Sequence, residues 1–378
     1  MSKAAGLVAA AALCLAACAP RQSDLGRVTD ASSPDGAPDG APDAAPDAAF
    51  DEALDAAADG VEDGRLDAAA DLGPACQIGG TRGDLPVTLG CTEAPLGRIV
   101  IGGDHLYWTV QGPGAIVMRA PLTGGGGEAL AFDDAGAFGL AVDATFVYYA
   151  QPARGRIMRL PLAGKGVPEA LATQLDQPLW LASDGKSLFW TGGQAGGAGT
   201  VMKLALTPGA EPVTLVDGQS QPRALALRDG FVYWTDIVDG TILRTPDHLL
   251  GPADAGVRTA SRLASGLKVP TDLLLIGAYA YAPDRAGHVQ RVPLEGGALE
   301  AVADVDGQPY SIASDGVALY WSVLGAGGGI FTGPLAPGAG KGTLVVGDQP
   351  DPHFVVLTAQ HVYWSTWGAY PAVHRLAR

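Results

Sequence analysis

Five side chains whose chemistry suits ligand binding each follow closely after a proline in this 378-residue sequence. They are an indole, a guanidinium, a carboxylate, a phenol and an imidazole, namely Trp180, Arg223, Asp272, Tyr310 and His353. If the fold brings these groups to one place, they would hold a polar ligand or a peptide. We therefore treat them as the candidate ligand-binding residues. The alternative is that they are exposed loop residues of mixed type.

Signatures of catalysis are sparse. The sequence contains no His-Glu-x-x-His, no Gly-x-Ser-x-Gly, no P-loop and no catalytic cysteine pair. The histidines are scattered over the expected strands and loops, at His105, His248, His288, His353, His361 and His374. We therefore predict no catalytic residue, no metal site and no cofactor.

An aromatic pair that ends a short apolar run recurs along the chain from residue 84 onward. The copies are Tyr107-Trp108, Tyr148-Tyr149, Phe189-Trp190, Tyr233-Trp234, Tyr320-Trp321 and Tyr363-Trp364, with a degenerate copy at Ala280-Tyr281. Measured at the second residue, the intervals are 41, 41, 44, 47, 40 and 43 residues. A period of this length is typical of a four-stranded β-propeller blade. We expect the large rings to pack between blades, as core residues.

Other features repeat in step with the aromatic pair. A tight turn precedes it, often Asp-Gly as at Asp229-Gly230, which is a strong hairpin signal. A strand of the form aliphatic-x-basic follows it, as in Val117-Met118-Arg119, and a last short strand such as Val213-Thr214-Leu215 completes the unit. Seven such units predict an all-β fold, a seven-bladed β-propeller of antiparallel four-stranded blades.

The two ends of the repeat region complement each other. The seventh unit stops at Arg378 after its third strand, whereas Leu85-Pro86-Val87-Thr88-Leu89 precedes the first unit and matches the fourth-strand motif. We therefore predict that the N-terminal strand completes the last blade. That arrangement closes the ring and removes two exposed strand edges.

The predicted ring places the five candidates around its central channel, at the face where the fourth-to-first and second-to-third strand loops meet. A second group on the latter loops would join them: Gln151, Arg154, Asp236, Asp239, Asp284, Arg285, Trp367 and Tyr370. A metal-dependent enzyme would need several acids converging on the channel floor, for which only Asp272 and Asp236 are candidates.

The aromatic pair resembles the YWTD repeat of receptor ectodomains and, more loosely, NHL-type and other extracytoplasmic propellers. Tyr233-Trp234-Thr235-Asp236 matches the YWTD motif in full, and Tyr107-Trp108-Thr109 matches three of its positions. The resemblance extends over nearly all of residues 84–378. It implies an extracytoplasmic propeller.

The first eighteen residues are typical of an export signal. Lys3 precedes an apolar run from Ala4 to Ala17, which is too short for a permanent membrane span. The run ends at Leu15-Ala16-Ala17-Cys18, which resembles the lipobox of bacterial lipoproteins. The resemblance implies lipidation of Cys18, and the alternative is an ordinary cleaved signal. Ala19 stands where Asp retains lipoproteins at the inner membrane, which favours the outer membrane.

Residues 19–75 form a predicted disordered tether. Ala, Asp, Pro and Gly dominate it, in four-residue repeats such as Pro34-Asp35-Gly36-Ala37. Such a composition cannot bury enough apolar area to offset chain entropy. Its acidic residues lack the spacing of a calcium loop, so we interpret the segment as a solvated spacer rather than a calcium site.

Cys76 and Cys91 remain after the predicted processing and flank the start of the propeller domain, residues 76–378. Export places them in an oxidising compartment, so we predict a disulfide at these cysteines. It would stabilise the junction between the N-terminal strand and the last blade.

Composition restricts the partners of the folded part. The formal charge of −16 argues against nucleic acid, because phosphate binding needs a basic surface. We expect a monomer, held at the membrane by its lipid and displayed on the periplasmic or surface side of the envelope. Its function would be that of a binding or scaffold module for an envelope protein, peptide or glycan. The alternative is a propeller enzyme, a lyase or metal-dependent lactonase acting on a small extracytoplasmic substrate.

Overall fold

The computed structural model describes residues 86–378 except Lys165, 194–198, 249–259, Ala326, Ala339 and Ala369. Within these residues the chain forms 28 β-strands and one short 3₁₀ helix, η1 (Pro152–Arg154). The predicted signal segment, the tether, Cys18 and Cys76 lie outside the described residues. The described residues contain no helix long and apolar enough to cross a membrane.

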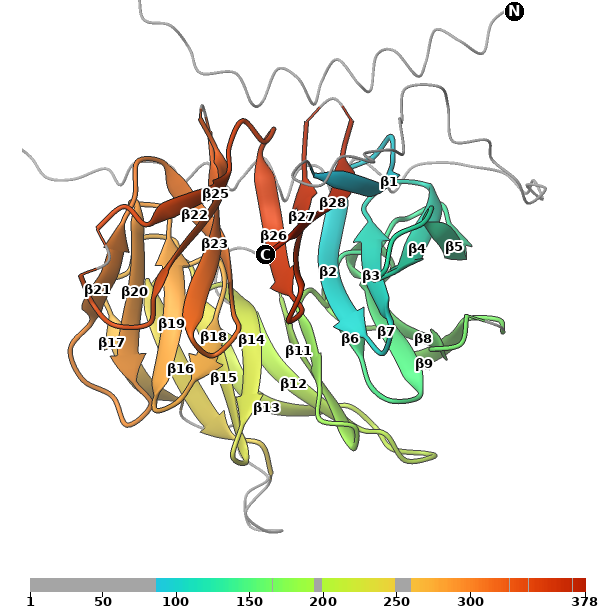
Figure 1. The fold of residues 1–378 in the computed structure, drawn as a ribbon. Coiled ribbons are helices and arrows are strands. Elements are labelled where there is room, and N and C mark those ends of the chain that lie inside the picture. Colours follow the sequence, from blue (N-terminus) through green and yellow to red (C-terminus); the bar gives the residue numbers. More distant parts are fainter. Residues whose placement is uncertain are drawn as a thin grey trace, which may run out of the picture. The chain divides into compact units, whose positions relative to one another are not determined.

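Seven four-stranded antiparallel sheets make up the ring, so the predicted seven-bladed propeller is confirmed (Figure 1). Blades 1 to 3 are formed by β2 (Leu96–Gly102), β3 (His105–Val110), β4 (Gly114–Pro121) and β5 (Glu128–Asp133); by β6 (Leu140–Val142), β7 (Phe146–Gln151), β8 (Arg156–Pro161) and β9 (Glu169–Ala172); and by β10 (Leu181–Ser183), β11 (Ser187–Gly192), β12 (Gly199–Ala205) and β13 (Val213–Gln219).

Blades 4 to 6 follow the same order. They are formed by β14 (Pro222–Arg228), β15 (Phe231–Asp236), β16 (Thr241–Pro246) and β17 (Ser261–Ser265); by β18 (Leu274–Ile276), β19 (Tyr279–Asp284), β20 (His288–Pro293) and β21 (Glu300–Asp304); and by β22 (Gln308–Ser314), β23 (Ala318–Leu324), β24 (Gly329–Pro334) and β25 (Thr343–Val346). The first strands of most neighbouring blades contact one another, so the first strand of each blade is the innermost.

The seventh blade combines the two ends of the described chain, as predicted. It contains β26 (Pro352–Leu357), β27 (His361–Thr366), β28 (Ala372–Ala377) and the N-terminal strand β1 (Val87–Cys91). β1 pairs antiparallel with β28, placing Thr88 opposite His374. β26 and β27 also contact β2, and Figure 1 shows the seventh blade beside β2 where the ring closes. Cys91, the last residue of β1, is disulfide-bonded.

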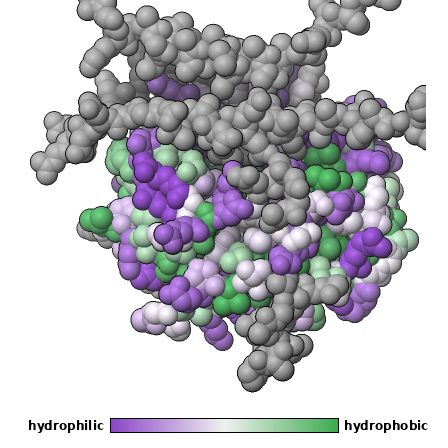
Figure 2. Space-filling view, turned by 180° about the vertical axis from the view of Figure 1, so that it is seen from behind, coloured by the Kyte–Doolittle hydropathy of each residue, from purple (hydrophilic) through white to green (hydrophobic). Residues whose placement is uncertain are grey.

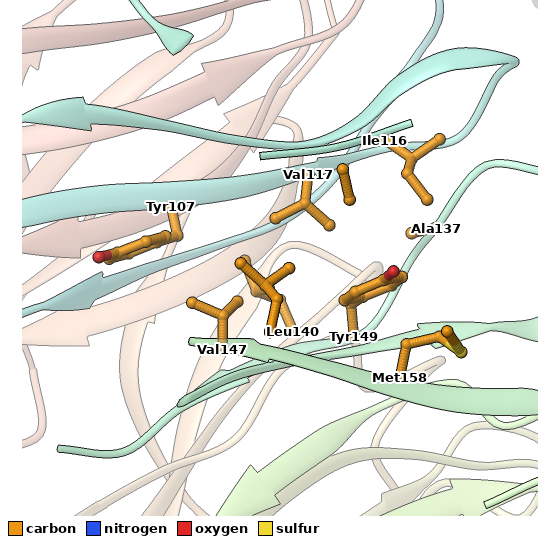
Figure 3. Packing of buried hydrophobic residues seen from close by; sticks show 10 residues of the cluster. Tyr107, Ile116, Val117, Ala137, Leu140, Val147, Tyr149 and Met158 are labelled. Carbon is orange, nitrogen blue, oxygen red and sulfur yellow. The ribbon is translucent and has the colours of Figure 1, made fainter. Parts of the chain in front are cut away.

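Apolar side chains fill the space between successive blades. Between blades 1 and 2, Tyr107 and Val117 face Leu140, Val147 and Tyr149 (Figure 3). All residues of the aromatic pairs are buried except Tyr320, which is half-buried. The second residue of that pair, Trp321, is fully buried. The expectation that these rings are core residues is therefore confirmed, and burial raises the pKa of Tyr149 to about 12.

The register corrects one predicted copy of the repeat. In six blades the first aromatic of the pair, or its equivalent, lies opposite the basic residue of the third strand, as Tyr107 does opposite Arg119. In blade 5 it is Tyr281 that lies opposite Arg291, so the pair is Tyr281-Ala282 and not Ala280-Tyr281. The sequence pattern misled because blade 5 has Ala where other blades have the second aromatic.

The tyrosine and the basic residue also join neighbouring blades. Tyr281 Oη and Arg291 Nη1 both donate to the backbone carbonyl of Leu335 in blade 6, at 3.1 and 3.0 Å. Tyr363 and Arg375 make the same pair of bonds to Leu122 across the closure of the ring. The repeated Tyr, basic and Pro-Leu positions therefore act together as an inter-blade contact.

Candidate functional site

The centre of the ring is lined by two adjacent residues of each blade, which lie within the first strand near its start or just before it. The second of the two lies ten residues before the second position of the aromatic pair in every blade. We call these the plug residues: Arg98, Gly139, Trp180, Ala224, Asp272, Ser311 and Phe354. The residue before each one lies nearer the fourth-to-first loop. We call these the rim residues: Gly97, Phe138, Leu179, Arg223, Thr271, Tyr310 and His353.

A local irregularity directs both residues of a pair inward. The pairing of the first and second strands shifts register at this point in blades 1, 4, 6 and 7, for example between Pro352 and Val355. Such a bulge interrupts the strict alternation of strand side chains and re-aims them. His353 and Phe354, which are adjacent in sequence, are therefore both buried toward the axis.

Side-chain hydroxyl groups form hydrogen bonds that connect this part of the first strand to the next blade. The residue after the aromatic pair is Thr or Ser in five blades: Thr109, Thr191, Thr235, Ser322 and Ser365. Ser322 Oγ accepts from the backbone N–H of Ser311, at 3.1 Å, and donates to the backbone carbonyl of His353 in the next blade. Thr191 links Trp180 N–H to the Arg223 carbonyl in the same way. In blades 1, 3 and 6 the third position of the repeat thus bonds to the rim backbone of the next blade.

The plug residues touch one another across the ring. The rings of Trp180 in blade 3 and Phe354 in blade 7 have centroids 5.8 Å apart. The Arg98 guanidinium from blade 1 lies 4.3 Å from the Trp180 ring and 5.4 Å from that of Phe354. At this level side chains from opposite blades occupy the centre of the ring.

An ion pair completes the plug. Arg98 Nη1 lies 3.4 Å from Asp272 Oδ1, between blades 1 and 5. The other carboxylate oxygen of Asp272 accepts from Ser311 Oγ at 2.7 Å and from the backbone N–H of Ile312 at 3.2 Å. Asp272 is therefore a satisfied structural anchor of the plug.

The rim is formed by a different set of contacts. The rings of Tyr310 and His353 lie edge to face with centroids 4.5 Å apart, and Arg223 Nη2 reaches Tyr310 Oη at 3.4 Å. Trp367, from the second-to-third loop of blade 7, stacks on His353 at 3.9 Å. Its indole N–H donates to the backbone carbonyl of Leu96.

His353 is a neutral imidazole at the rim. Its Nδ1 donates to the backbone carbonyl of Asp351 at 2.9 Å, which leaves Nε2 as an acceptor. Burial, together with the nearby positive charges of Arg285 and Arg223, lowers the pKa of His353 to about 3. Asp351 has a left-handed φ of 44°, although it is not glycine and precedes a proline. Backbone strain of this kind is often held at functional sites.

The five predicted residues thus fall into two groups. Arg223, Tyr310 and His353 meet at the rim, whereas Trp180 and Asp272 belong to the plug beneath it. The prediction missed Arg98, Phe138, Ser311 and Phe354. Counting ten and eleven residues back from the second residue of each aromatic pair would have found all four.

Several residues of the second predicted group hold loops. Asp236 and Asp284 are each 1 % exposed and accept several backbone N–H groups, including those of Ser220 and Lys268. Burial raises the pKa of Asp236. Gln151 donates to the Gly136 carbonyl, and Asp239 accepts from the hydroxyl of Ser220. Arg285 and Trp367 reach the rim, while Arg154 pairs with Asp133 and Asp134 and Tyr370 is exposed.

Among the described residues no three His, Cys, Asp or Glu side chains are grouped so as to hold a metal ion. The largest exposed apolar side chains lie on different blades, as with Phe132, Val238 and Leu344. Figure 2 shows hydrophilic and hydrophobic residues interspersed over the visible described surface.

No protein-family model matches the chain, and no curated protein matches it. Solved propellers do. A catalytically inactive virginiamycin B lyase from Staphylococcus aureus, solved with Quinupristin, matches with a TM-score of 0.61 and 12% identity over 77% of this chain and 98% of that chain. The β-propeller domain of Cps50 (Swd1) from Myceliophteria thermophila matches with a TM-score of 0.56 and 13% identity over 76% and 99%. A nidogen/laminin complex matches with a TM-score of 0.43 and 19% identity over 55% and 76%. At these identities the first two matches show only that the fold is shared. One of the two matched proteins is a lyase, and the other is described as a β-propeller domain.

Proposed function

We propose that this protein is an envelope-displayed lipoprotein whose propeller is a binding module, with the rim as its binding site. The observation that carries the proposal is the meeting of Arg223, Tyr310, His353 and Trp367, from blades 4, 6 and 7, at the loop face. Residues this far apart in sequence present two aromatic rings, a guanidinium and an imidazole together. Such a mixture suits a polar ligand from a protein, peptide or glycan.

The state of His353 favours binding over catalysis. A general base works best when its pKa lies near the operating pH. Burial and two neighbouring guanidinium groups lower the pKa of His353 to about 3, so it is a weak proton acceptor near neutral pH. A neutral imidazole with a fixed tautomer is instead a well-defined hydrogen-bond acceptor for a ligand.

The alternative enzyme, a lyase, has one supporting observation. An imidazole and a phenol lie with ring centroids 4.5 Å apart, which is a pair able to move protons on a substrate. Turnover of a small cyclic or ester substrate that disappears in both Tyr310→Phe and His353→Gln would favour this alternative over binding alone.

The binding proposal is tested by crosslinking the full-length protein in envelope preparations and comparing rim variants. Tyr310→Phe and His353→Gln keep most of the packing and change the polar groups. Tyr281→Phe is the matched control, because its hydroxyl bonds Leu335 in an inter-blade contact away from the rim. Loss of a crosslinked partner in the rim variants but not in the control supports the proposal. Equal capture by all of them contradicts the assignment of the rim.

The anchor is a separate part of the proposal and rests on the Leu15-Ala16-Ala17-Cys18 motif. Cys18→Ser should abolish incorporation of labelled fatty acid and move the protein from the detergent phase to the aqueous phase. Retention of the label in this variant would contradict lipidation at Cys18. Fractionation of the wild-type protein then tests the outer-membrane assignment.

A further inference from the structure

The loop face beside the rim carries an excess of exposed acidic side chains. The segments that lead from a fourth strand into blades 6, 7 and 1, residues 304–307, 347–351 and 92–95, contain no Lys or Arg. They contain five exposed acids, which we call the acidic arc: Glu93, Asp304, Asp306, Asp348 and Asp351. Lys341 pairs with Asp306, and within the described part of the chain no Lys or Arg pairs with the other four. This part of the loop face is therefore strongly negative.

Backbone hydrogen bonds join two of these segments through the second-to-third loop of blade 7. Trp367 donates its backbone N–H to the Asp351 carbonyl at 3.0 Å. Thr92, which precedes Glu93, donates its backbone N–H to the Pro371 carbonyl at 3.0 Å. The acids on either side of blade 7 thus belong to one continuous surface.

Aromatic side chains lie within this surface. Tyr370, on the same loop of blade 7, is 67 % exposed. Trp367 is half-buried and stacks on the rim residue His353. Exposed aromatic rings attract ammonium and guanidinium groups. The surface therefore offers both carboxylates and an aromatic ring to a cationic group, next to the rim.

Two acids of the arc stand where other blades have a glutamine that stabilises the fold. In blades 4 and 7, the residue fifteen positions before the Trp of the aromatic pair is Gln219 or Gln349. Its amide oxygen accepts the indole N–H, at 3.2 Å in blade 4 and 3.0 Å in blade 7. In blades 1 and 6 the same position holds Glu93 and Asp306, whose side chains are exposed.

The corresponding indoles have no acceptor. Trp108 and Trp321 are fully buried, and their Nε1 atoms have no hydrogen-bond partner among the described residues. The equivalence of the blades directs each of these N–H groups toward the segment that carries Glu93 or Asp306. An unsatisfied buried donor lowers stability, and a glutamine would satisfy it. Exposed residues that are retained against the needs of the fold are typical of a binding surface.

We propose that the acidic arc is the docking surface for a Lys- and Arg-rich segment of a protein partner. The carboxylates of Glu93 and Asp348 receive its ammonium and guanidinium groups, and Tyr370 packs against them. Such complementary charge also accelerates association. This inference rests on the proposed binding function and names the kind of segment that the loop face recognises.

The test uses the full-length protein and two immobilised pools of hexapeptides that are acetylated at the N-terminus and amidated at the C-terminus. One pool contains Lys and Arg, and in the other Gln and citrulline stand in their places. We expect binding of the cationic pool to be at least about 10-fold tighter, because several exposed ion pairs act together. Added salt should weaken that binding.

Variants of equal net charge assign the contact to the arc. The arc variant combines Glu93→Gln, Asp304→Asn, Asp306→Gln, Asp348→Asn and Asp351→Asn. Asn is suited to residues 348 and 351, which have left-handed φ values of 55° and 44°. The control neutralises five exposed acids on the first-to-second and third-to-fourth loops, through Asp104→Asn, Asp184→Asn, Glu211→Gln, Asp229→Asn and Glu295→Gln.

The arc variant should bind the cationic pool about 10-fold more weakly than the wild type, and the control should bind it like the wild type. The acidic residues of segment 19–75 are common to all three proteins, so they do not contribute to the difference. Circular dichroism verifies that each variant is folded. If the arc variant is not folded, Glu93→Gln and Asp348→Asn are compared singly with Glu211→Gln.

A second measurement tests the exchange of glutamine for a carboxylate. Asp306→Gln should raise the denaturation midpoint, because the new amide accepts the Trp321 N–H. Gln349→Asp should lower it, because Trp364 loses its acceptor. A variant that is more stable and yet binds the cationic pool more weakly shows that the acid serves binding. A lower midpoint in Asp306→Gln contradicts this part of the argument.

Two outcomes would overturn the inference. One is equal binding of the two pools, including no retention of either, and the other is an equal loss of binding in the arc variant and the control. If the rim variants lose the crosslinked envelope partner while the two pools bind alike, the proposed function stands and only the cationic segment fails. If the arc variant loses that partner while the rim variants keep it, the arc stands and the assignment of the rim fails.

Discussion

The seam between the first and last strands of the propeller should weaken in acid because of His374. This residue lies on β28, with Nδ1 at 3.2 Å from Thr88 Oγ1 on the closing strand β1 and Nε2 at 3.1 Å from Thr366 Oγ1. Its ring stacks on Trp364. Burial lowers the pKa of His374 from 6.5 to about 4. The folded protein thus holds a neutral imidazole at the junction of its two ends.

Proton linkage determines whether the free energy of unfolding rises or falls with pH. Between pH 6.5 and 4 the unfolded chain binds a proton at this histidine and the folded protein does not, so stability falls as the pH falls. A difference of 2.5 pKa units corresponds to about 3 kcal/mol in the free energy of unfolding. About 2 kcal/mol of this should be lost between pH 7.5 and pH 5, and nearly all of it below pH 4.

The assay is denaturant unfolding at several pH values for the wild-type protein and His374→Gln. Glutamine keeps groups that bond hydroxyls but does not titrate, and other acid-sensitive groups such as His353 are common to both proteins. The stability of the variant relative to the wild type should therefore rise by about 2 kcal/mol from pH 7.5 to pH 5. Hydrogen exchange should show the loss in the wild type first at β1. A difference that stays constant over this pH range would refute the reasoning.

The remaining predictions concern the bonds that hold the ring. Thr191→Val should lower the free energy of unfolding by about 1–3 kcal/mol, because it leaves the Trp180 N–H and the Arg223 carbonyl without their shared hydroxyl. Thr235→Val should be neutral or stabilising in the same denaturation assay, since Thr235 Oγ1 is buried without a partner among the described residues; an equal loss in both variants would contradict the role of the hydroxyl bridge. Tyr281→Phe should cost about 1 kcal/mol by removing the bond to Leu335, and an unchanged melting curve would argue against this inter-blade contact. Cys91→Ser should cost about 2–5 kcal/mol relative to the oxidised wild type through loss of its disulfide, and the reduced wild type should unfold at the same denaturant concentration as the variant.

Part of the candidate site could be predicted from the sequence. The proline-marked loops led to Arg223, Tyr310 and His353, because each blade enters the centre of the ring at an equivalent position. The same reasoning placed Trp180 and Asp272 with them, although they lie one tier deeper. Trp180 and Asp272 are each the second residue after their proline, whereas the three rim residues are the first. Only the contacts across the closed ring show that these two adjacent positions belong to different tiers.

The sequence by itself determined the number of blades, the order of their strands and the closure of the ring by β1. These features depend on local patterns, namely aromatic pairs, Asp-Gly turns and a fourth-strand motif displaced to the start of the repeat region. Only the tertiary structure decided which inner side chains touch. Arg98 meets Asp272, and Trp180 meets Phe354, because closing the ring brings side chains from opposite blades to a common axis. Those contacts depend on side-chain size and on bulges at positions up to 174 residues apart, which no periodicity along the chain encodes.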